Sequence, residues 1–80
     1  MGWYVYILEC ADATYYTGIT TDIERRIAAH EAGTGAKYTK GRGPLNLIYE
    51  EECADRSSAS KREIEIKALS KAQKLALISP

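Results

Sequence analysis

The stretch WYVYILECADATYYTGIT, residues 3–20, decides the fold of this 80-residue chain. Residues 3–10 are aromatic and β-branched with little polar alternation, which is typical of a strand covered on both faces. Residues 11–13, ADA, are a short turn signal, and residues 14–20, TYYTGIT, have the composition of a second strand. The stretch therefore predicts an antiparallel hairpin.

The tyrosines of this hairpin are also chemically informative, because the chain has six tyrosines and no phenylalanine. A ring that only fills a core needs no hydroxyl, and a buried hydroxyl needs a hydrogen-bond partner. Alternation along the strands puts Tyr6 on one face of the first, and Tyr16 and Gly18 on one face of the second. If the register permits, the hairpin brings Tyr6 and Tyr16 onto a common surface.

A helix is expected after the hairpin. Thr21 and Glu24 have the spacing of a capping box, which predicts the helix start. Ile23 and Ile27 form an apolar pair one turn apart that would face the sheet. Gly33 is placed to end the helix in the left-handed conformation.

The remaining elements complete an α+β pattern in a single domain over residues 1–80. Ser70 and Gln73 have the spacing of a second capping box, which predicts a short final helix. The predicted order is β-β-α-β-α-α, with helices packed against a small sheet. The segments after the first helix are a glycine-rich loop over 33–44, a strand over 45–53, a helix over 55–69 and the last helix over 71–78.

Composition excludes several classes of protein. An apolar content of 45% argues against disorder. Cys10 and Cys53 are far apart and lack the spacing of a metal site, so we expect two reduced thiols in a cytoplasmic protein. No apolar run approaches the ~20 residues of a membrane span.

The charges are balanced in number but not in position. Formal net charge is zero, which by itself counts against nucleic-acid binding. Basic residues gather in 25–42 and 56–74, and they would form a positive face if these segments converge. A solvated surface of mixed charge is the alternative. The candidate nucleic-acid contacts are Arg25, Lys37, Tyr38, Lys40, Arg42, Lys61 and Lys67; the tyrosine ring can stack on a base.

The first helix carries two candidates for chemistry. Arg26 and His30 are one turn apart and flank the apolar stripe of Ile23 and Ile27. A guanidinium beside the sheet suits an anion, because its donors match phosphate oxygens bidentately. Pairing with a local carboxylate is the alternative for Arg26, and a structural role is the alternative for His30.

The second long helix carries a third candidate. Glu63 lies at the margin of an apolar stripe formed by Ala59, Ile66 and Leu69, whereas Glu65 points away from it. A carboxylate at the edge of a buried face needs a cation, a metal or several donors. A salt bridge and a site for a hard metal such as Mg²⁺ are both open. Two phenols, a guanidinium, an imidazole and a carboxylate together suit phosphodiester cleavage.

The sequence resembles the GIY-YIG nuclease family over nearly its whole length. The tripeptides YVY, residues 4–6, and YTG, residues 16–18, are similar to the paired signature of the family, although Tyr4 and Val5 replace its Gly and Ile. The runs ERRIAAH and KREIEIKAL resemble its next elements. The resemblance is to small stand-alone bacterial members, and it implies a three-stranded antiparallel sheet flanked by helices.

The resemblance also implies roles for single residues. It makes Tyr6 the general base or the phenol that orients water, with Tyr16 supporting the nucleophile and the phosphate. It gives Arg26 the stabilisation of the phosphoryl transition state, and it places His30 near the site.

Two further residues receive roles from the resemblance. Glu63 becomes the single carboxylate that binds Mg²⁺ or Mn²⁺, and Gly18 allows close packing beside the site. The implied activity is divalent-metal-dependent endonucleolytic hydrolysis of DNA in repair or recombination. RNA and branched or flapped structures stay open as substrates, and a protein partner could provide targeting. A module that binds nucleic acid without cutting is the main alternative, and a protein-interaction domain is the third.

Overall fold

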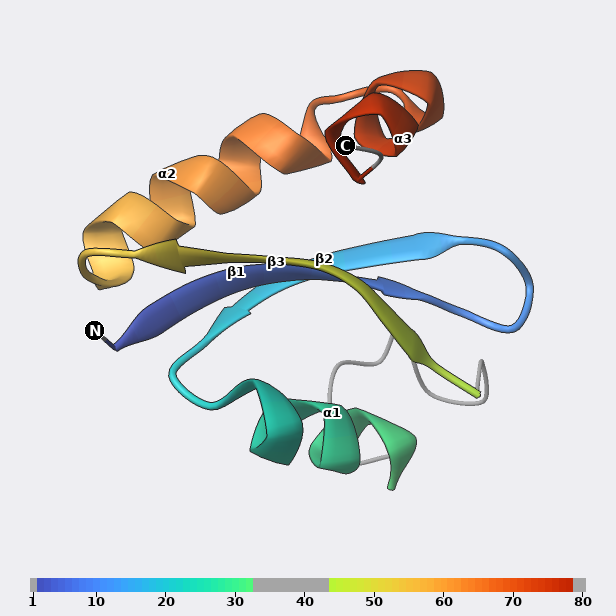
Figure 1. Ribbon diagram of the computed structural model, residues 1–80, viewed down its shortest axis with the longest axis horizontal. Coiled ribbons are helices and arrows are strands. Elements are labelled where there is room, and N and C mark those ends of the chain that lie inside the picture. The colour runs from blue at the N-terminus through green and yellow to red at the C-terminus, as the bar shows by residue number, and fades with distance from the viewer. Residues whose placement is uncertain (1, 33–43, 79–80) are drawn as a thin grey trace.

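The computed structural model of the chain describes residues 2–32 and 44–78. Its elements follow the predicted order and confirm the α+β fold (Figure 1). They are β1 (Trp3–Glu9), β2 (Tyr15–Thr20), α1 (Ile23–Glu31), β3 (Asn46–Cys53), α2 (Arg56–Lys67) and α3 (Lys71–Ile78). The predicted helix end at Gly33 and nearly all of the predicted loop lie outside the described residues.

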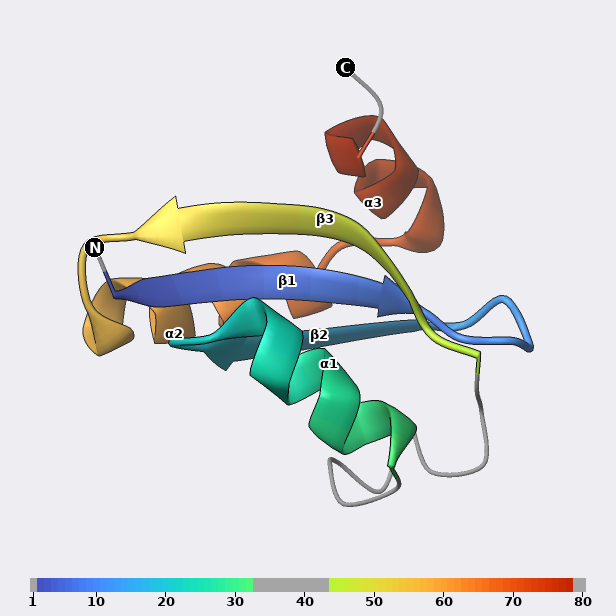
Figure 2. The same ribbon diagram turned by 60° about the horizontal axis from the view of Figure 1, so that its bottom comes forward.

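The three strands form one antiparallel sheet in the order β2-β1-β3 (Figure 2). β1 is the central strand, and four consecutive residues, from Val5 to Leu8, are completely or almost completely buried. This confirms the prediction of a strand covered on both faces. The register places Tyr6 between Gly18 of β2 and Glu50 of β3.

Helices cover both faces of the sheet, with α1 on one side and α2 and α3 on the other (Figure 1). Because side chains alternate along a strand, β1 supplies Tyr6 and Leu8 to one core cluster and Val5 and Ile7 to another. The first cluster, which we call the α1-side core, also contains Cys10, Leu45, Tyr16, Ile23 and Ile27. The second, the α2-side core, contains Cys53, Ala59 and Ile66 and partly buried rings such as Trp3, Tyr15 and Tyr49.

The helix caps are partly as predicted. The box at α3 is confirmed, since the Ser70 amide donates to Gln73 Oε1 at 2.9 Å and the Gln73 amide donates to Ser70 Oγ at 3.2 Å. The prediction of Thr21 as the cap of α1 is wrong: Asp22 Oδ1 accepts from the Arg25 amide at 3.1 Å. Aspartate is a strong N-cap, and its charge suits a helix N-terminus, so the helix begins one residue later than expected.

The two edge strands differ in charge. β2 carries no charged side chain, whereas β3 carries Glu50, Glu51 and Glu52 in succession. Glu51 points to the α2 side, where it accepts from Tyr49 and Arg62. Cys10 and Cys53 are buried, free thiols in different core clusters, as expected of reduced cysteines. Among the described helices, none combines the length and apolar character needed to cross a membrane.

Candidate active site

Two phenols and an imidazole meet on the α1 side of the sheet. The Tyr6 hydroxyl and His30 Nε2 are 2.9 Å apart, in hydrogen-bonding contact. The Tyr16 ring lies 6.3 Å from the Tyr6 ring and 5.1 Å from the His30 ring, measured between centroids. Tyr6 is 1% exposed and His30 is 2% exposed. The predicted common surface of Tyr6 and Tyr16 is therefore present, and His30 joins it.

Gly18 allows this arrangement because the Tyr6 side chain lies across it. A Cβ atom at position 18 would stand 2.6 Å from the Tyr6 hydroxyl oxygen and 3.0 Å from a Tyr16 ring carbon. Real Cβ atoms do not approach that closely, so any side chain at position 18 would displace the phenol. The close packing expected of Gly18 is thus a contact with the two tyrosines themselves.

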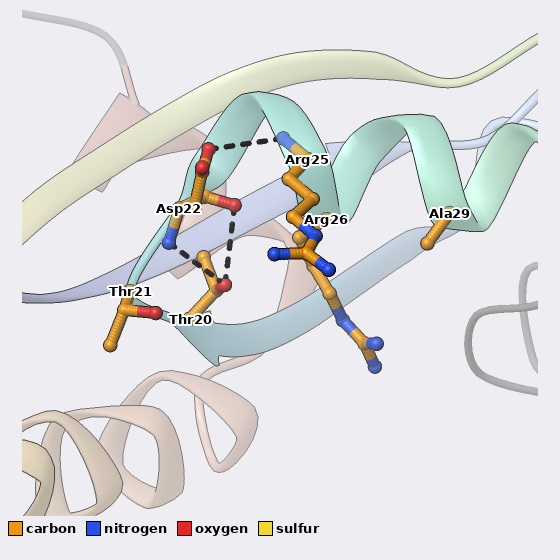
Figure 3. A pocket seen from close by; sticks show the side chains of 6 residues that line it. All are labelled: Thr20, Thr21, Asp22, Arg25, Arg26 and Ala29. Atoms are coloured by element: carbon orange, nitrogen blue, oxygen red, sulfur yellow. Dashed lines mark hydrogen bonds between the residues drawn. The ribbon is translucent and has the colours of Figure 1, made fainter.

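Arg26 lies beside this cluster, one helical turn before His30. Contact with the Tyr6 hydroxyl raises the pKa of Arg26, and Tyr16 adds to the effect. Arg26 also borders a hollow of about 300 Å³ at the start of α1, shown in Figure 3. Arg25 lines the same hollow, so two guanidinium groups border one space, and Arg26 also contacts the Tyr6 hydroxyl. Its other lining residues are Thr20, Thr21, Asp22 and Ala29.

The pKa of Tyr6 lies above its usual range. Burial is the largest cause, and the negative charges of ionised Tyr16 and Glu63 act in the same direction. The Arg26 guanidinium opposes the rise because it stabilises the phenolate. Since burial prevails, Tyr6 is a protonated phenol at neutral pH, and it needs a partner that removes its proton before it can act as a base.

His30 has the properties of that partner. Burial lowers the pKa of His30, and the nearby Arg26 guanidinium lowers it further. The imidazole is therefore neutral at neutral pH, with one nitrogen able to accept a proton. In the tautomer with a bare Nε2, that acceptor faces the Tyr6 hydroxyl at 2.9 Å.

Glu63 approaches the cluster from the other side of the sheet. It belongs to α2, which packs against β1 and the edge strand β2, and its carboxylate is near enough to raise the pKa of Tyr6. Glu63 Oε2 forms a salt bridge with Lys67 Nζ at 3.2 Å, so the salt-bridge interpretation of this residue holds in this structure. Glu65 points elsewhere, as predicted, and pairs with Arg62.

The donor set at Glu63 is compatible with a hard divalent cation. Magnesium typically uses one or two carboxylates, with water and substrate phosphate oxygens completing its shell. Glu63 is one partly buried carboxylate whose charge acts on Tyr6, and Arg26, which contacts Tyr6, is suited to phosphate. Within residues 2–32 and 44–78, no group of three or more His, Cys, Asp or Glu side chains forms a ready-made metal site. Among these described residues, Glu63 is the carboxylate that the family resemblance assigns to such a site.

The other predicted nucleic-acid contacts are spread over the molecule. Arg25 borders the hollow with Arg26, Lys67 is paired with Glu63, and Lys61 is exposed on α2. Lys37, Tyr38, Lys40 and Arg42 lie outside the described residues. Sequence reasoning overlooked the part of Thr20 and Asp22 in shaping the hollow. The strong N-cap preference of aspartate was the available signal for Asp22.

Comparison with known proteins identifies related chains. The GIY-YIG catalytic domain matches residues 2–76. A UPF0213 protein from Natronomonas pharaonis is 55% identical over 95% of this chain and 89% of its own length. One from Halobacterium salinarum is 57% identical over 92% of this chain and 96% of its own length.

Solved structures show the same fold. The solution structure of a UPF0213 protein from Bacillus halodurans is 49% identical, with a TM-score of 0.64, and the match covers 99% of this chain and 84% of that one. A protein from E. faecalis, also solved by NMR, is 42% identical with a TM-score of 0.64, covering 92% of this chain and 79% of that one. The signature tyrosines, the matched domain and these relatives together show that the chain belongs to the GIY-YIG family, whose members are generally endonucleases.

Proposed function

We propose that this protein is a divalent-metal-dependent endonuclease that hydrolyses phosphodiester bonds in DNA. The observation that carries the proposal is the 2.9 Å contact between Tyr6 and a neutral, buried His30, with Arg26 beside both. A structural tyrosine could use any acceptor. The combination of a proton acceptor and a phosphate-binding guanidinium on the same phenol is what phosphodiester hydrolysis requires.

In the proposed reaction, Tyr6 and His30 work as a relay. The Tyr6 oxygen takes a proton from the attacking water while its own proton passes to His30 Nε2. The water oxygen then bonds to phosphorus, and the bond to the leaving oxygen breaks as solvent provides that oxygen with a proton. His30 returns its proton to solvent after the product leaves. The relay compensates for the high pKa of Tyr6, because the phenolate never has to exist as a free anion.

Arg26 and Tyr16 hold the phosphate. The Arg26 guanidinium can donate two parallel hydrogen bonds to non-bridging oxygens, on which negative charge builds in the transition state. The Tyr16 ring lies beside both Tyr6 and His30 and can donate its hydroxyl to the same group. Glu63 would hold the divalent cation, Mg²⁺ or Mn²⁺, which supplies Lewis-acid polarisation of the scissile phosphate when bound.

The charge of the chain limits how it finds a substrate. Arg25 and Arg26 line one hollow, but formal net charge is zero, so long-range attraction to DNA is weak. We therefore propose that the protein acts in DNA repair or recombination, where a partner protein or an unusual DNA structure supplies the recruitment. RNA is included among the substrates to be tested.

A cleavage assay with matched pairs of variants tests the proposal. Tyr6→Phe, Arg26→Ala and Glu63→Gln should each lower cleavage of plain, flapped and branched DNA by about 10²-fold or more. Each of these three variants has a control that makes the same kind of substitution at a residue outside the proposed site. The three control variants should cleave at the wild-type rate. They are Tyr49→Phe and Glu65→Gln, both in the network around Arg62, and Arg56→Ala at the Trp3 ring.

The assay also separates the alternatives. Cleavage should require Mg²⁺ or Mn²⁺ and disappear with a chelator. Cleavage that continues in Glu63→Gln, or without divalent metal, would contradict the proposed site. Salt-sensitive binding of DNA or RNA that is never cut under any metal condition would instead identify a binding module on the same scaffold.

A further inference from the structure

A second basic hollow lies on the opposite side of the sheet from the Tyr6 cluster. It has a volume of about 280 Å³ and is lined by Ala13, Thr14, Tyr15, Lys71 and Lys74. The β1–β2 turn and the start of β2 form one wall, and α3 forms the other. None of these residues takes part in the proposed chemistry.

Lys71 is held in a defined position in this hollow. Its Nζ donates to the Ala13 carbonyl at 3.0 Å and lies 5.2 Å from the centre of the Tyr15 ring. The turn that presents this carbonyl is itself ordered, because the Ala13 amide donates to the Cys10 carbonyl at 2.9 Å. An ammonium group has three donors, so Lys71 keeps donors for a ligand while its position is fixed.

Lys74 lines the same hollow one helical turn further along α3. Over residues 2–32 and 44–78, neither Lys71 nor Lys74 forms a salt bridge with a carboxylate. The nearest acidic residue in the turn, Asp12, accepts two hydrogen bonds from Thr14, one from its amide and one from its hydroxyl. The hollow therefore offers two ammonium groups to an anion.

The position of this hollow relates it to the proposed active site. Tyr15 and Gly18 lie three residues apart on the edge strand β2, a spacing of about 10 Å at a rise of about 3.3 Å per residue. The Tyr15 ring and the Tyr6 side chain that lies over Gly18 are on opposite faces of the sheet. Because β2 is an edge strand, a nucleic-acid strand that passes along this edge can contact both faces. Because the hollow and the Tyr6 cluster lie on opposite faces of the sheet, a phosphate held by the lysines is a different phosphate from the one at the Tyr6 cluster.

From these observations we infer that Lys71 and Lys74 form a phosphate-binding subsite for the nucleic-acid backbone. It holds a phosphodiester group other than the one that is cut. The inference rests on the proposed function for the identity of the ligand, a nucleic-acid strand. Because the subsite touches no base edge, it adds affinity without sequence preference.

Binding measurements in the presence of a chelator test the subsite separately from cleavage. A labelled single strand is titrated at several salt concentrations against wild type, Lys71→Gln, Lys74→Gln and the control Arg56→Gln. Arg56 is the first residue of α2, and its guanidinium lies over the Trp3 ring. Each lysine variant should reduce the slope of log K against log salt by about 0.7, the value for one phosphate of a single strand, whereas the control should leave it unchanged.

A chemically altered substrate locates the contact. A neutral methylphosphonate is placed singly at successive positions along the strand. In wild type, affinity should fall most at one position away from the cleaved bond, and the Lys71→Gln, Lys74→Gln double variant should be insensitive to that substitution. Equal slopes for the lysine variants and the control, or no difference between wild type and double variant in this scan, would overturn the subsite.

Failure of the subsite and failure of the nuclease proposal give different results. If wild type cuts DNA but the lysine variants keep the full salt dependence, only the subsite is wrong. If wild type neither binds nor cuts any nucleic acid tested, the proposed function fails, and the inferred ligand fails with it. Circular dichroism and melting of each variant exclude unfolding as the cause.

Discussion

The two faces of β1 bury different chemistry within one short strand. Towards α2 and α3 it contributes Val5 and Ile7 to a cluster completed by Ala59 and Ile66, all of them with 0% exposure. Towards α1 it contributes Tyr6, whose hydroxyl meets a buried imidazole. Burial of aliphatic surface stabilises the fold, whereas burial of a phenol and a histidine shifts their pKa values. The α2-side core thus consists of buried aliphatic contacts, and the α1-side core holds the groups to which we assign the proposed reaction.

The largest expected effect tests the stabilising face. Ile66→Ala should lower the free energy of unfolding by about 2 to 5 kcal/mol, because it leaves a cavity in the α2-side core. Urea denaturation measures it, and cleavage per folded molecule should stay near wild type. The control is Ile64→Ala on the same helix, where the side chain is 68% exposed and the cost should be within about 0.5 kcal/mol. Equal costs at positions 64 and 66 would refute the assignment of this core.

Gly18→Ala acts on the reactive face. The new Cβ would stand 2.6 Å from the Tyr6 hydroxyl, so the phenol must move, at a cost of about 1 to 3 kcal/mol in unfolding free energy and with loss of cleavage. Thermal melting and the nicking rate measure the two effects. In a Tyr6→Phe background the nearest clash is gone, so the same substitution should cost less stability. Identical costs in the two backgrounds would show that the phenol does not lie across Gly18.

The pH dependence of stability sharpens the comparison further. Burial lowers the pKa of His30 below its ordinary value of about 6.5, so the unfolded chain binds this proton more readily than the folded one. The free energy of unfolding should therefore hold above about pH 6.5 and fall as the pH drops from there through the lower pKa of the folded state. Urea titrations between pH 8 and pH 5 measure this, and His30→Gln should flatten the profile in that window. A slope that persists in His30→Gln would assign the effect to another group.

The smallest expected effect concerns the salt bridge between Glu63 and Lys67 within α2. Lys67→Gln removes the ammonium group that pairs with Glu63, and both side chains are partly exposed, so the pair contributes little. The Mg²⁺ concentration for half-maximal cleavage at saturating DNA should fall by about two- to five-fold, since the carboxylate loses a competing cation. Arg56→Gln should leave it unchanged. A higher Mg²⁺ requirement in Lys67→Gln would mean that the lysine supports the metal site.

The features that depend on the residue pattern within one strand or helix were predictable from the sequence. The continuous apolar character of residues 3–10 identified the central strand, and alternation placed Tyr6 and Tyr16 on one surface. Helical spacing placed Arg26 and His30 together on α1. These features depend on periodicity within single elements, which a sequence displays directly.

The features that were missed depend on contacts between elements or on competition between neighbouring residues. Thr21 and Asp22 are both good N-caps, and which one begins the helix depends on how the chain leaves β2. The spacing of α2 left a salt bridge and a metal site open for Glu63, and the family resemblance gave it the metal role; the effect of its charge on the pKa of Tyr6 is visible only in the fold. The placement of Lys71 on the Tyr15 ring joins residues from two distant parts of the chain, and neither part indicates it alone.

The unequal charge of the two edge strands has a consequence for how copies of this small protein behave together. An open strand edge can pair with the edge of another molecule and start aggregation, and charged side chains suppress this. Glu50, Glu51 and Glu52 give β3 that protection, because two copies brought together there would set glutamates against glutamates. β2 lacks such charges, so its unpaired backbone stays accessible where the proposed substrate passes. Bound nucleic acid would then also shield the one uncharged edge from self-association.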